Sequence, residues 1–173
     1  MDILENKAQW QNTYRDKFLA HYHKTGALDW KLYPHLRNTQ APSGPGVDPS
    51  SARLMLISSA GGYLPGEQEP FDAAHLLGDY TIRLIPSATP PEALAFAHDH
   101  YDHAAVDRDP QTLMPLDHLE DLTGEGLIGD LSPSVVSFMG YQPDVARVVD
   151  ELIPPILEAT AAERVDATLL IPT

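Results

Sequence analysis

The segment from His98 to Asp109 holds the highest density of chemically useful side chains in this 173-residue chain. Its twelve residues include four aspartates and three of the eight histidines of the chain, His98, His100 and His103. Side chains of these types bind metal ions, transfer protons or hold polar substrates. A second interpretation is a hydrogen-bond network that fixes a loop. The residue types alone leave both open.

Metal binding is one chemistry that this segment can perform. The imidazole and carboxylate groups of His98, His100, Asp102 and His103 suit Zn, Ni or Fe(II). A His-x-His pair places both rings on one face of a strand, but the rings diverge on a helix. A helix-like apolar run at 92–97 precedes the pair, so either conformation can follow. We favour an acid–base site or a hydrogen-bond network and assign no metal.

Three short apolar runs, at 53–58, 134–139 and 166–171, are typical of parallel strands that are buried on both faces. An alternating run at 80–86 predicts a further strand. A long helix at 144–164 joins the last two apolar runs into a βαβ unit. The pattern predicts an α/β fold with a mainly parallel, Rossmann- or flavodoxin-like three-layer sheet.

The residues that follow these strands are candidate ligand contacts, because open α/β sheets bind ligands at the carboxyl ends of their strands. After the first run the chain continues with Ser59, Gly61 and Gly62, and the second run ends at Met139 and Gly140. Glycines there allow a sharp turn and a close approach of the backbone to a ligand. A tight turn without a ligand is the other interpretation of the first of these loops.

The N-terminal part of the chain predicts an amphipathic helix at 2–24, which we interpret as a helical arm spanning 1–33. A Pro- and Gly-rich linker follows at 34–52, before the α/β domain at 53–173. The linker would allow the arm to pack elsewhere or on a second subunit. Short helices are expected at 90–98 and 117–122.

Composition excludes several classes of function. The formal net charge of −14 argues against nucleic acid and anionic membranes as partners. The chain contains no cysteine, so it offers no disulfide and no thiol nucleophile. Neither a long apolar segment nor a signal peptide is evident, and we expect a cytoplasmic protein.

Eight short motifs, in order, resemble those of the selenoprotein B family, the substrate-handling subunits of glycine, sarcosine, betaine and D-proline reductases. The resemblance runs from about residue 53 to residue 173. The motifs are Ser-Ala-Gly-Gly-Tyr at 59–63, Glu-Pro-Phe-Asp at 69–72, Gly-Asp-Tyr-Thr-Ile-Arg-Leu-Ile-Pro at 78–86, His-Asp-His-Tyr-Asp at 98–102, Asp-Arg-Asp-Pro at 107–110, Pro-Leu-Asp-His-Leu at 115–119, Glu-Gly-Leu-Ile-Gly at 125–129 and Ser-Phe-Met-Gly-Tyr at 137–141.

In that family the strand equivalent to 167–173 is followed at once by a selenocysteine-x-x-cysteine motif. The resemblance therefore implies a selenocysteine directly after Thr173, although this chain itself holds no cofactor. Selenocysteine is encoded by a stop codon. We expect the 173 residues to be the front part of a reductase subunit, with an incomplete α/β domain and no activity alone.

The resemblance also implies an activity, which is reductive cleavage of a carbon–nitrogen or similar bond in a small amine or amino-acid-like substrate. Arg83 would bind the substrate carboxylate, and the acid–base groups would protonate the leaving amine. Partners would be other reductase subunits or a second copy. The implied catalytic residues are His98, His100, Tyr101 and Asp102, and the implied substrate contacts are Ser59, Gly61, Gly62, Arg83, Asp107, Met139 and Gly140.

One spatial prediction tests this assignment. His98, His100 and Asp102 should lie close to the carboxyl end of the 167–171 strand, where the selenocysteine would follow. The alternative function is a non-catalytic α/β domain that uses the 98–109 segment to bind a ligand or a metal.

Overall fold

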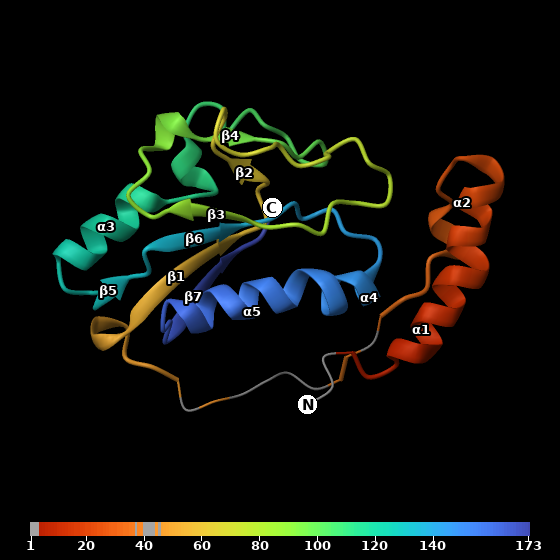
Figure 1. The fold of residues 1–173 in the computed structure, drawn as a ribbon, viewed down its shortest axis with the longest axis horizontal. Helices are drawn as coiled ribbons and strands as arrows, with labels where there is room; N and C mark the ends of the chain where they lie inside the picture. The colour runs from red at the N-terminus through yellow and green to blue at the C-terminus, as the bar shows by residue number, and fades with distance from the viewer. Residues whose placement is uncertain (1–3, 37, 40–43, 45) are drawn as a thin grey trace.

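The computed structural model describes residues 4–36, 38–39, 44 and 46–173 and has a mixed α/β fold (Figure 1). The strands are β1 (Arg53–Ser58), β2 (Gly62–Tyr63), β3 (Arg83–Pro86), β4 (Ala95–Phe96), β5 (Asp130–Leu131), β6 (Ser134–Ser137) and β7 (Ala167–Ile171). The α-helices are α1 (Lys7–Thr13), α2 (Ala20–Thr25), α3 (Leu116–Gly124), α4 (Val145–Arg147) and α5 (Ile153–Ala162). Parts of the predicted arm and linker, residues 2–3, 37, 40–43 and 45, lie outside the described residues.

The main sheet is built around β1, which pairs with three other strands of the described chain. β1 pairs in parallel with β7 over residues 54–58 and, along its other edge, with β5 at 53–54 and β6 at 57–58. β3 pairs antiparallel with β6, so the sheet is mostly parallel. This confirms the predicted mixed α/β class, whereas the Rossmann- or flavodoxin-like assignment stays a prediction.

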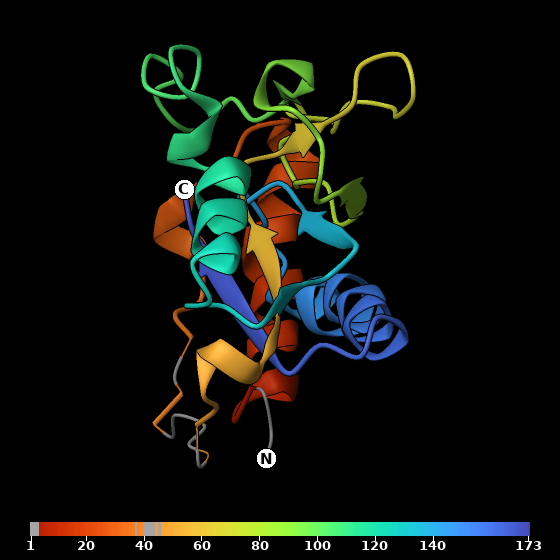
Figure 2. The same cartoon turned by 90° about the vertical axis from the view of Figure 1, so that its left-hand side faces the viewer.

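Helices lie on both sides of the sheet (Figure 2). One apolar cluster joins Leu56 and Val135 to α3 residues Leu116 and Leu119. A second cluster joins Met55, Ile57 and Val136 to Ala159 of α5. Successive residues of β1 therefore point into opposite clusters, which is why this short run is apolar throughout.

β7 differs from the prediction of a strand that is buried on both faces, and that prediction is wrong. Leu169 and Leu170 are 37% and 65% exposed, respectively. The helices cover β1 and β6, and β7 pairs only with β1 within the described part of the chain. β7 is therefore an edge strand of the described sheet.

The expected helix at 90–98 is also wrong. Pro91–Ala93 form one 3-10 turn, and Ala95–Phe96 form β4, which pairs antiparallel with β2. The Ala97 N–H donates to Gly61 O (2.9 Å) and extends this pairing. An apolar run of six residues is too short to nucleate a helix against such a competing strand.

The other predicted helices form, with shifted boundaries. α3 begins at Leu116, so Asp117 lies in its first turn and does not cap it. α4, a π-helical segment at Val148–Leu152 and α5 make one continuous helix that passes through Pro154 and Pro155. The π-helical segment just before the prolines shifts the backbone hydrogen bonds where their N–H groups are missing.

The N-terminal helices pack on this chain itself (Figure 1). α1, a π-helical segment at Tyr14–Leu19 and α2 run continuously and end at Gly26. Trp10, Tyr14 and Phe18 form a buried cluster with Ala146 of α4, here called the arm cluster. The arm thus packs against the N-terminal end of the long helix.

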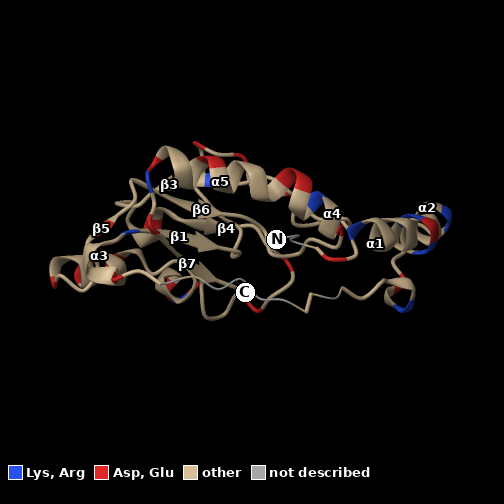
Figure 3. Cartoon of the chain, turned by 90° about the horizontal axis from the view of Figure 1, so that it is seen from below, with Lys and Arg blue, Asp and Glu red and all other residues tan. Residues whose placement is uncertain are grey.

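Charge is carried mainly by the helices and loops (Figure 3). Most of the ribbon of the main sheet is tan in that view. Arg53 and Asp130, at the start of β1 and β5, form an ion pair (2.9 Å). Among the described helices, none is both long and apolar enough to cross a lipid bilayer.

Candidate functional site

The carboxyl ends of β1, β6 and β7 meet at one edge of the main sheet. The Ser59 N–H donates to Ile171 O (3.0 Å), which ties the loop after β1 to β7. The Gly61 N–H donates to Phe138 O (2.9 Å), and the Gly140 N–H donates to Ser59 O (3.0 Å). These bonds hold the three loops together with their polar side chains on the same edge.

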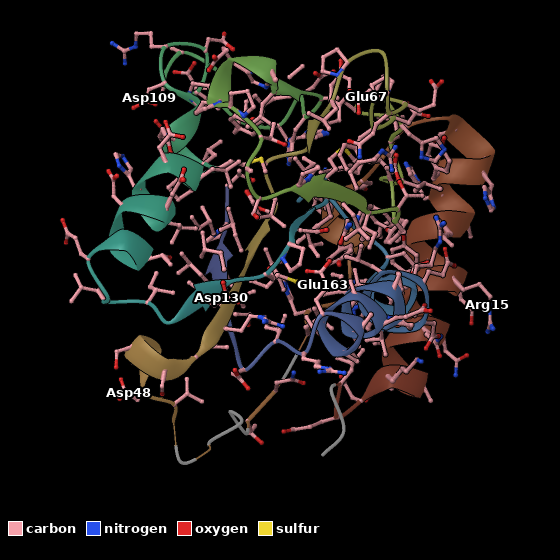
Figure 4. All side chains as sticks on the ribbon, turned by 60° about the vertical axis from the view of Figure 1, so that its left-hand side comes forward. Arg15, Asp48, Glu67, Asp109, Asp130 and Glu163 are labelled. Carbon is pink, nitrogen blue, oxygen red and sulfur yellow. The ribbon has the colours of Figure 1, made fainter. Side chains whose placement is uncertain are left out.

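Figure 4 shows how this edge relates to the rest of the molecule. Glu67 and Asp109 lie in loops at the end toward which β1 runs, and Asp48 lies at the opposite end. The loops that contain the predicted site segments thus gather at one end of the molecule.

A polar corner forms around Gly140 where the three loops meet. A Cβ atom placed on Gly140 would lie 3.1 Å from Ser59 Oγ, 3.1 Å from Thr173 Oγ1 and 3.2 Å from His98 Nε2. Ser59 Oγ also accepts the Thr173 N–H (2.9 Å), and the two hydroxyl oxygens are 3.1 Å apart. We call Ser59, His98, Gly140 and Thr173 the Gly140 corner.

His98 is the most buried polar residue of the 98–109 segment, with 3% of its surface exposed. Its Nδ1 accepts the His100 N–H (3.1 Å), and this bond places the proton of the neutral ring on Nε2. Nε2 is buried and has no hydrogen-bond partner among the residues that the structure describes. Burial, together with the neighbouring His100 and His103, lowers the pKa of His98, so the ring is neutral at pH 7.

The neighbours of His98 hold its backbone in place. His103 Nε2 lies 2.6 Å from His98 O, and the Tyr101 ring stacks on the His103 ring with centroids 4.5 Å apart. The Tyr101 hydroxyl donates to Ala60 O (3.1 Å), which ties the segment to the loop after β1. Burial raises the pKa of Tyr101 to about 12, so its hydroxyl stays protonated as a donor.

His100 is exposed to solvent, and its ring meets the His98 ring edge-on with centroids 5.8 Å apart. Its ring stacks on that of Tyr141, with centroids 3.8 Å apart. His100 is therefore the histidine best placed to exchange protons with water, and His98 is the one best placed to hold a buried group.

The sequence profile of the glycine/sarcosine/betaine reductase selenoprotein B family matches residues 38–173. This chain belongs to that family. It is 30% identical over 117 residues to the D-proline reductase subunit gamma of Acetoanaerobium sticklandii, covering 68% of this chain and 47% of that protein. It is 32% identical over 118 residues to the sarcosine reductase complex component B subunit beta of Peptoclostridium acidaminophilum, covering 66% of this chain and 27% of that protein.

A third selenoprotein B relative is the glycine reductase complex component B subunit gamma of Carboxydothermus hydrogenoformans. It is 27% identical over 137 residues, covering 78% of this chain and 31% of that protein. The chain thus spans about half the length of the D-proline reductase relative and about a third or less of the other two. No solved structure matches this chain significantly.

The spatial prediction made from the selenoprotein B motifs is confirmed for His98. The shared proximity of His98 Nε2 and Thr173 Oγ1 to the Gly140 Cβ position places the histidine at the carboxyl end of β7. His100 follows two residues later in the same turn. Asp102 is exposed, and its carboxylate accepts the Ala104 N–H (2.9 Å), so it shapes the turn.

A metal site finds no support within the part of the chain that the structure describes. It contains no group of three or more His, Cys, Asp or Glu side chains arranged to hold a metal ion. The candidate ligands His98, His100, Asp102 and His103 all lie in this part. Two of them already have a ring nitrogen in contact with the backbone of this segment: His98 Nδ1 accepts the His100 N–H, and His103 Nε2 contacts His98 O.

Arg83, the expected carboxylate clamp of the selenoprotein B assignment, is engaged by the protein. Its guanidinium donates to Glu69 O (2.8 Å), Thr81 Oγ1 (2.8 Å), Ile82 O (3.0 Å) and Pro70 O (3.3 Å). It also lies over the Phe71 ring, 4.3 Å from the centroid. These contacts fix the 69–71 loop, and substrate binding by Arg83 stays a prediction.

Gly61, Gly62 and Met139 lie inside the protein. Gly61 has φ = 71°, and a Cβ atom there would lie 2.6 Å from Ala97 O. A Cβ atom on Gly62 would lie 2.5 Å from Met114 Sδ. The close approach that these glycines permit is therefore to other parts of the chain, and their contact with substrate stays a prediction.

Asp107 is not one of the residues that meet at the Gly140 corner. It is exposed, its carboxylate lies 3.9 Å from His103 Nδ1, and it lines a cavity of about 690 Å³ together with Phe96 and Arg108. Its contact with substrate stays a prediction.

Two residues at the edge were missed as site residues. Thr173 completes the Gly140 corner, and its signal was its place at the end of an apolar strand. Tyr141 stacks on the His100 ring, and the sequence feature that could have indicated it is an aromatic residue directly after the glycine at the end of the 134–140 run.

Proposed function

We propose that this chain forms the substrate-handling part of a reductase subunit that cleaves a carbon–nitrogen, or similar, bond of a small amino-acid-like substrate. The observation that carries the proposal is the convergence of the three strand ends on the Gly140 corner, with the buried His98 Nε2 directed into it. Its membership of the selenoprotein B family names the reaction class, because the relatives are D-proline, sarcosine and glycine reductase components.

The reaction takes up two electrons and two protons. The carbon–nitrogen bond breaks, a hydrogen replaces nitrogen on carbon, and the nitrogen leaves as a protonated amine. His98, His100, Tyr101 and Asp102 make up the proposed acid–base segment, in which the exposed His100 transfers protons and the neutral His98 donates a hydrogen bond. Ser59 and Gly140 contact the substrate at the corner.

The electrons require a redox nucleophile that the 173 residues do not supply, because they contain no cysteine. We propose that a selenocysteine follows Thr173 in the full protein and that an external dithiol reduces it. A chalcogen anion with a low pKa is ionised and nucleophilic at neutral pH. Thr173 would place that residue beside His98, since both approach the Gly140 Cβ position.

The proposal extends to partners and architecture. Relatives of this chain are subunits or complex components, so other reductase subunits are the proposed partners, with a second copy as the other possibility. The arm at 1–33, the linker at 34–52 and the domain at 53–173 are proposed as its units. A Rossmann- or flavodoxin-like sheet is proposed for the complete domain.

The test compares the 173-residue chain with the full reading frame of its gene. The codons after 173 are sequenced, and the full protein is expressed with selenocysteine insertion and supplied with its partner subunits. Dithiol-dependent amine release is then measured with glycine, sarcosine, betaine and D-proline. We expect turnover of at least one substrate by the full protein and none by the 173-residue chain.

A matched pair of substitutions separates the site from the fold. His98→Phe in the full protein should lower kcat by about 100-fold, within the range that a lost acid–base or donor group causes. His118→Phe, on the exposed face of α3, should leave kcat unchanged. Turnover by the 173-residue chain would contradict the proposal that the nucleophile is a selenocysteine after Thr173. Ligand binding without turnover by the full protein would favour the non-catalytic alternative.

A further inference from the structure

We propose that the Gly140 corner binds one oxygen of a small carboxylate, with the His98 Nε2–H as its main donor and the Thr173 hydroxyl as its second. The inference deepens the proposed function, since it assigns the substrate carboxylate to this corner in place of Arg83, and it rests on that function only for the identity of the ligand. The donors themselves follow from the hydrogen bonds of the structure.

The first step concerns His98. Its Nδ1 is occupied as an acceptor by the His100 N–H, so its Nε2 carries a proton. That N–H is buried and has no acceptor in the part of the chain that is described. A buried donor without a partner carries a free-energy cost, and such groups in native proteins call for an explanation. An acceptor brought by a ligand recovers this cost.

The second step concerns the two hydroxyl groups. Ser59 Oγ accepts the Thr173 N–H (2.9 Å), and one hydroxyl hydrogen suffices for the 3.1 Å contact between Ser59 Oγ and Thr173 Oγ1. If Ser59 donates in that contact, the Thr173 hydrogen is left with only a 3.4 Å contact to Ser59 O. A closer acceptor can therefore take the Thr173 hydrogen.

The third step concerns charge. None of the side chains of the corner carries a carboxylate, although the chain has a net charge of −14. The backbone carboxyl group of Thr173 is charged only where residue 173 is the C-terminus, and it is a neutral peptide carbonyl where another residue follows. Neutral donors in a buried setting bind an anion through charge-assisted hydrogen bonds, which are stronger than bonds between neutral groups. A cation would find no negative group among the side chains of the corner.

The fourth step concerns access and size. Gly140 and Thr173 are exposed, whereas Ser59 and His98 are buried, so a ligand reaches the corner from the Gly140 side. A Cβ atom on Gly140 would lie within 3.2 Å of all three polar atoms. Glycine at this position therefore leaves the corner open, and any side chain would fill it. Only a narrow group such as a carboxylate oxygen fits.

The experiment observes the His98 ring directly in the 173-residue chain, prepared with a C-terminal amide so that the backbone carboxyl group of Thr173 adds no negative charge to the corner. The chain is labelled with ¹⁵N-histidine, and long-range ¹H–¹⁵N spectra are recorded at pH 7.5 while acetate is added as the probe. We expect a protonated Nε2 on His98 before addition and a saturable shift of its signal with acetate. Acetamide, the uncharged analogue, should shift it at least tenfold more weakly at equal concentration.

Two glycine variants give the matched control. Gly140→Ala should weaken acetate binding by at least tenfold, because the new methyl group occupies the corner. Gly124→Ala should bind as the unaltered chain does, since a Cβ atom there meets nothing within 4 Å. Thermal unfolding of both variants shows whether each is folded.

Three results overturn the inference: a proton on Nδ1 of His98, no saturable shift with acetate, or equal acetate binding by a folded Gly140→Ala variant. Because no turnover is measured, failure of the reductase assay leaves this binding result intact. Conversely, turnover by the full protein without acetate binding here would place the carboxylate elsewhere, at Arg83 for example.

Discussion

The arm cluster and the Gly140 corner are both contacts between segments that are distant along the chain, but they differ in chemistry. In the arm cluster the rings of Trp10 and Tyr14 stack with centroids 4.6 Å apart, and the Trp10 Nε1–H donates to Pro34 O (3.0 Å). In the corner, polar atoms from three loops converge, and one of the donors, the His98 Nε2–H, lacks an acceptor.

The difference teaches where stability and function are located. Aromatic burial contributes free energy in proportion to the apolar area removed from water, and it needs little polar matching. A set of converging polar groups contributes less to the free energy of folding, and it is destabilising when one of its buried donors has no acceptor. The Tyr14 hydroxyl in the arm cluster is also buried without a hydrogen-bond partner among the described residues.

The largest effect is expected from removing the centre of the arm cluster. Trp10 is 1% exposed, so Trp10→Ala should lower the free energy of unfolding by about 3–5 kcal/mol. Trp30→Ala, at a residue that is 52% exposed, is the control and should cost about 1 kcal/mol or less. Urea denaturation followed by far-UV circular dichroism measures both. Equal losses would show that the arm cluster does not dominate stability.

A smaller effect is expected from adding a methyl group at Gly61, in the loop after β1. Gly26 and Gly61 share φ = 71°, but a Cβ atom meets nothing within 4 Å at Gly26 and lies 2.6 Å from Ala97 O at Gly61. Gly26→Ala should cost about 1–2 kcal/mol, for the left-handed backbone alone. Gly61→Ala should lower the free energy of unfolding by about 1–3 kcal/mol more than Gly26→Ala does, because the backbone at Ala97 must move away from the new methyl group. Similar midpoints of thermal unfolding for the two variants would mean that the backbone at 97–98 shifts at little cost in free energy.

The smallest effect is a pH dependence that His98 adds to stability. Its pKa is lowered by burial and by His100 and His103, against a raising contribution from Asp99. The unfolded chain, with a histidine pKa of about 6.5, therefore binds more protons in this range. The contribution is complete above about pH 6.5 and is lost as the pH falls toward the lowered pKa of His98.

Urea midpoints between pH 5 and 8 measure this contribution. His98→Phe should flatten the slope below pH 6.5, and His118→Phe, at an exposed histidine, should leave it unchanged. An unaltered slope in His98→Phe would assign the pH dependence to other groups and weaken the contrast between the two regions.

Much of the fold could be predicted because continuous apolar runs and strand-end glycines are local signals. The strands at 53–58 and 167–171 and the meeting of their ends at Ser59 follow from the rule that parallel strands share a carboxyl edge. The placement of His98 beside Thr173 rested on the family motifs, which carry long-range information that periodicity lacks.

The errors have physical causes that a local reading cannot reveal. β4 exists only because β2 offers it a partner, so the run at 92–97 could not show a strand by itself. Exposure of Leu170 depends on which elements cover the sheet edge. Each outcome is decided by tertiary contacts that override local propensity.

The bond between Ser59 and Thr173 joins residues 114 positions apart, and the adjacent strands β1 and β7 are equally distant along the chain. Closing a loop of this length costs conformational entropy, which the pairing of β7 with β1 must offset. β7 lies at the edge of the described sheet, so local opening of β7 would dismantle the corner while the contacts of the arm cluster stay in place. Binding at the corner would report directly on whether β7 is paired with β1.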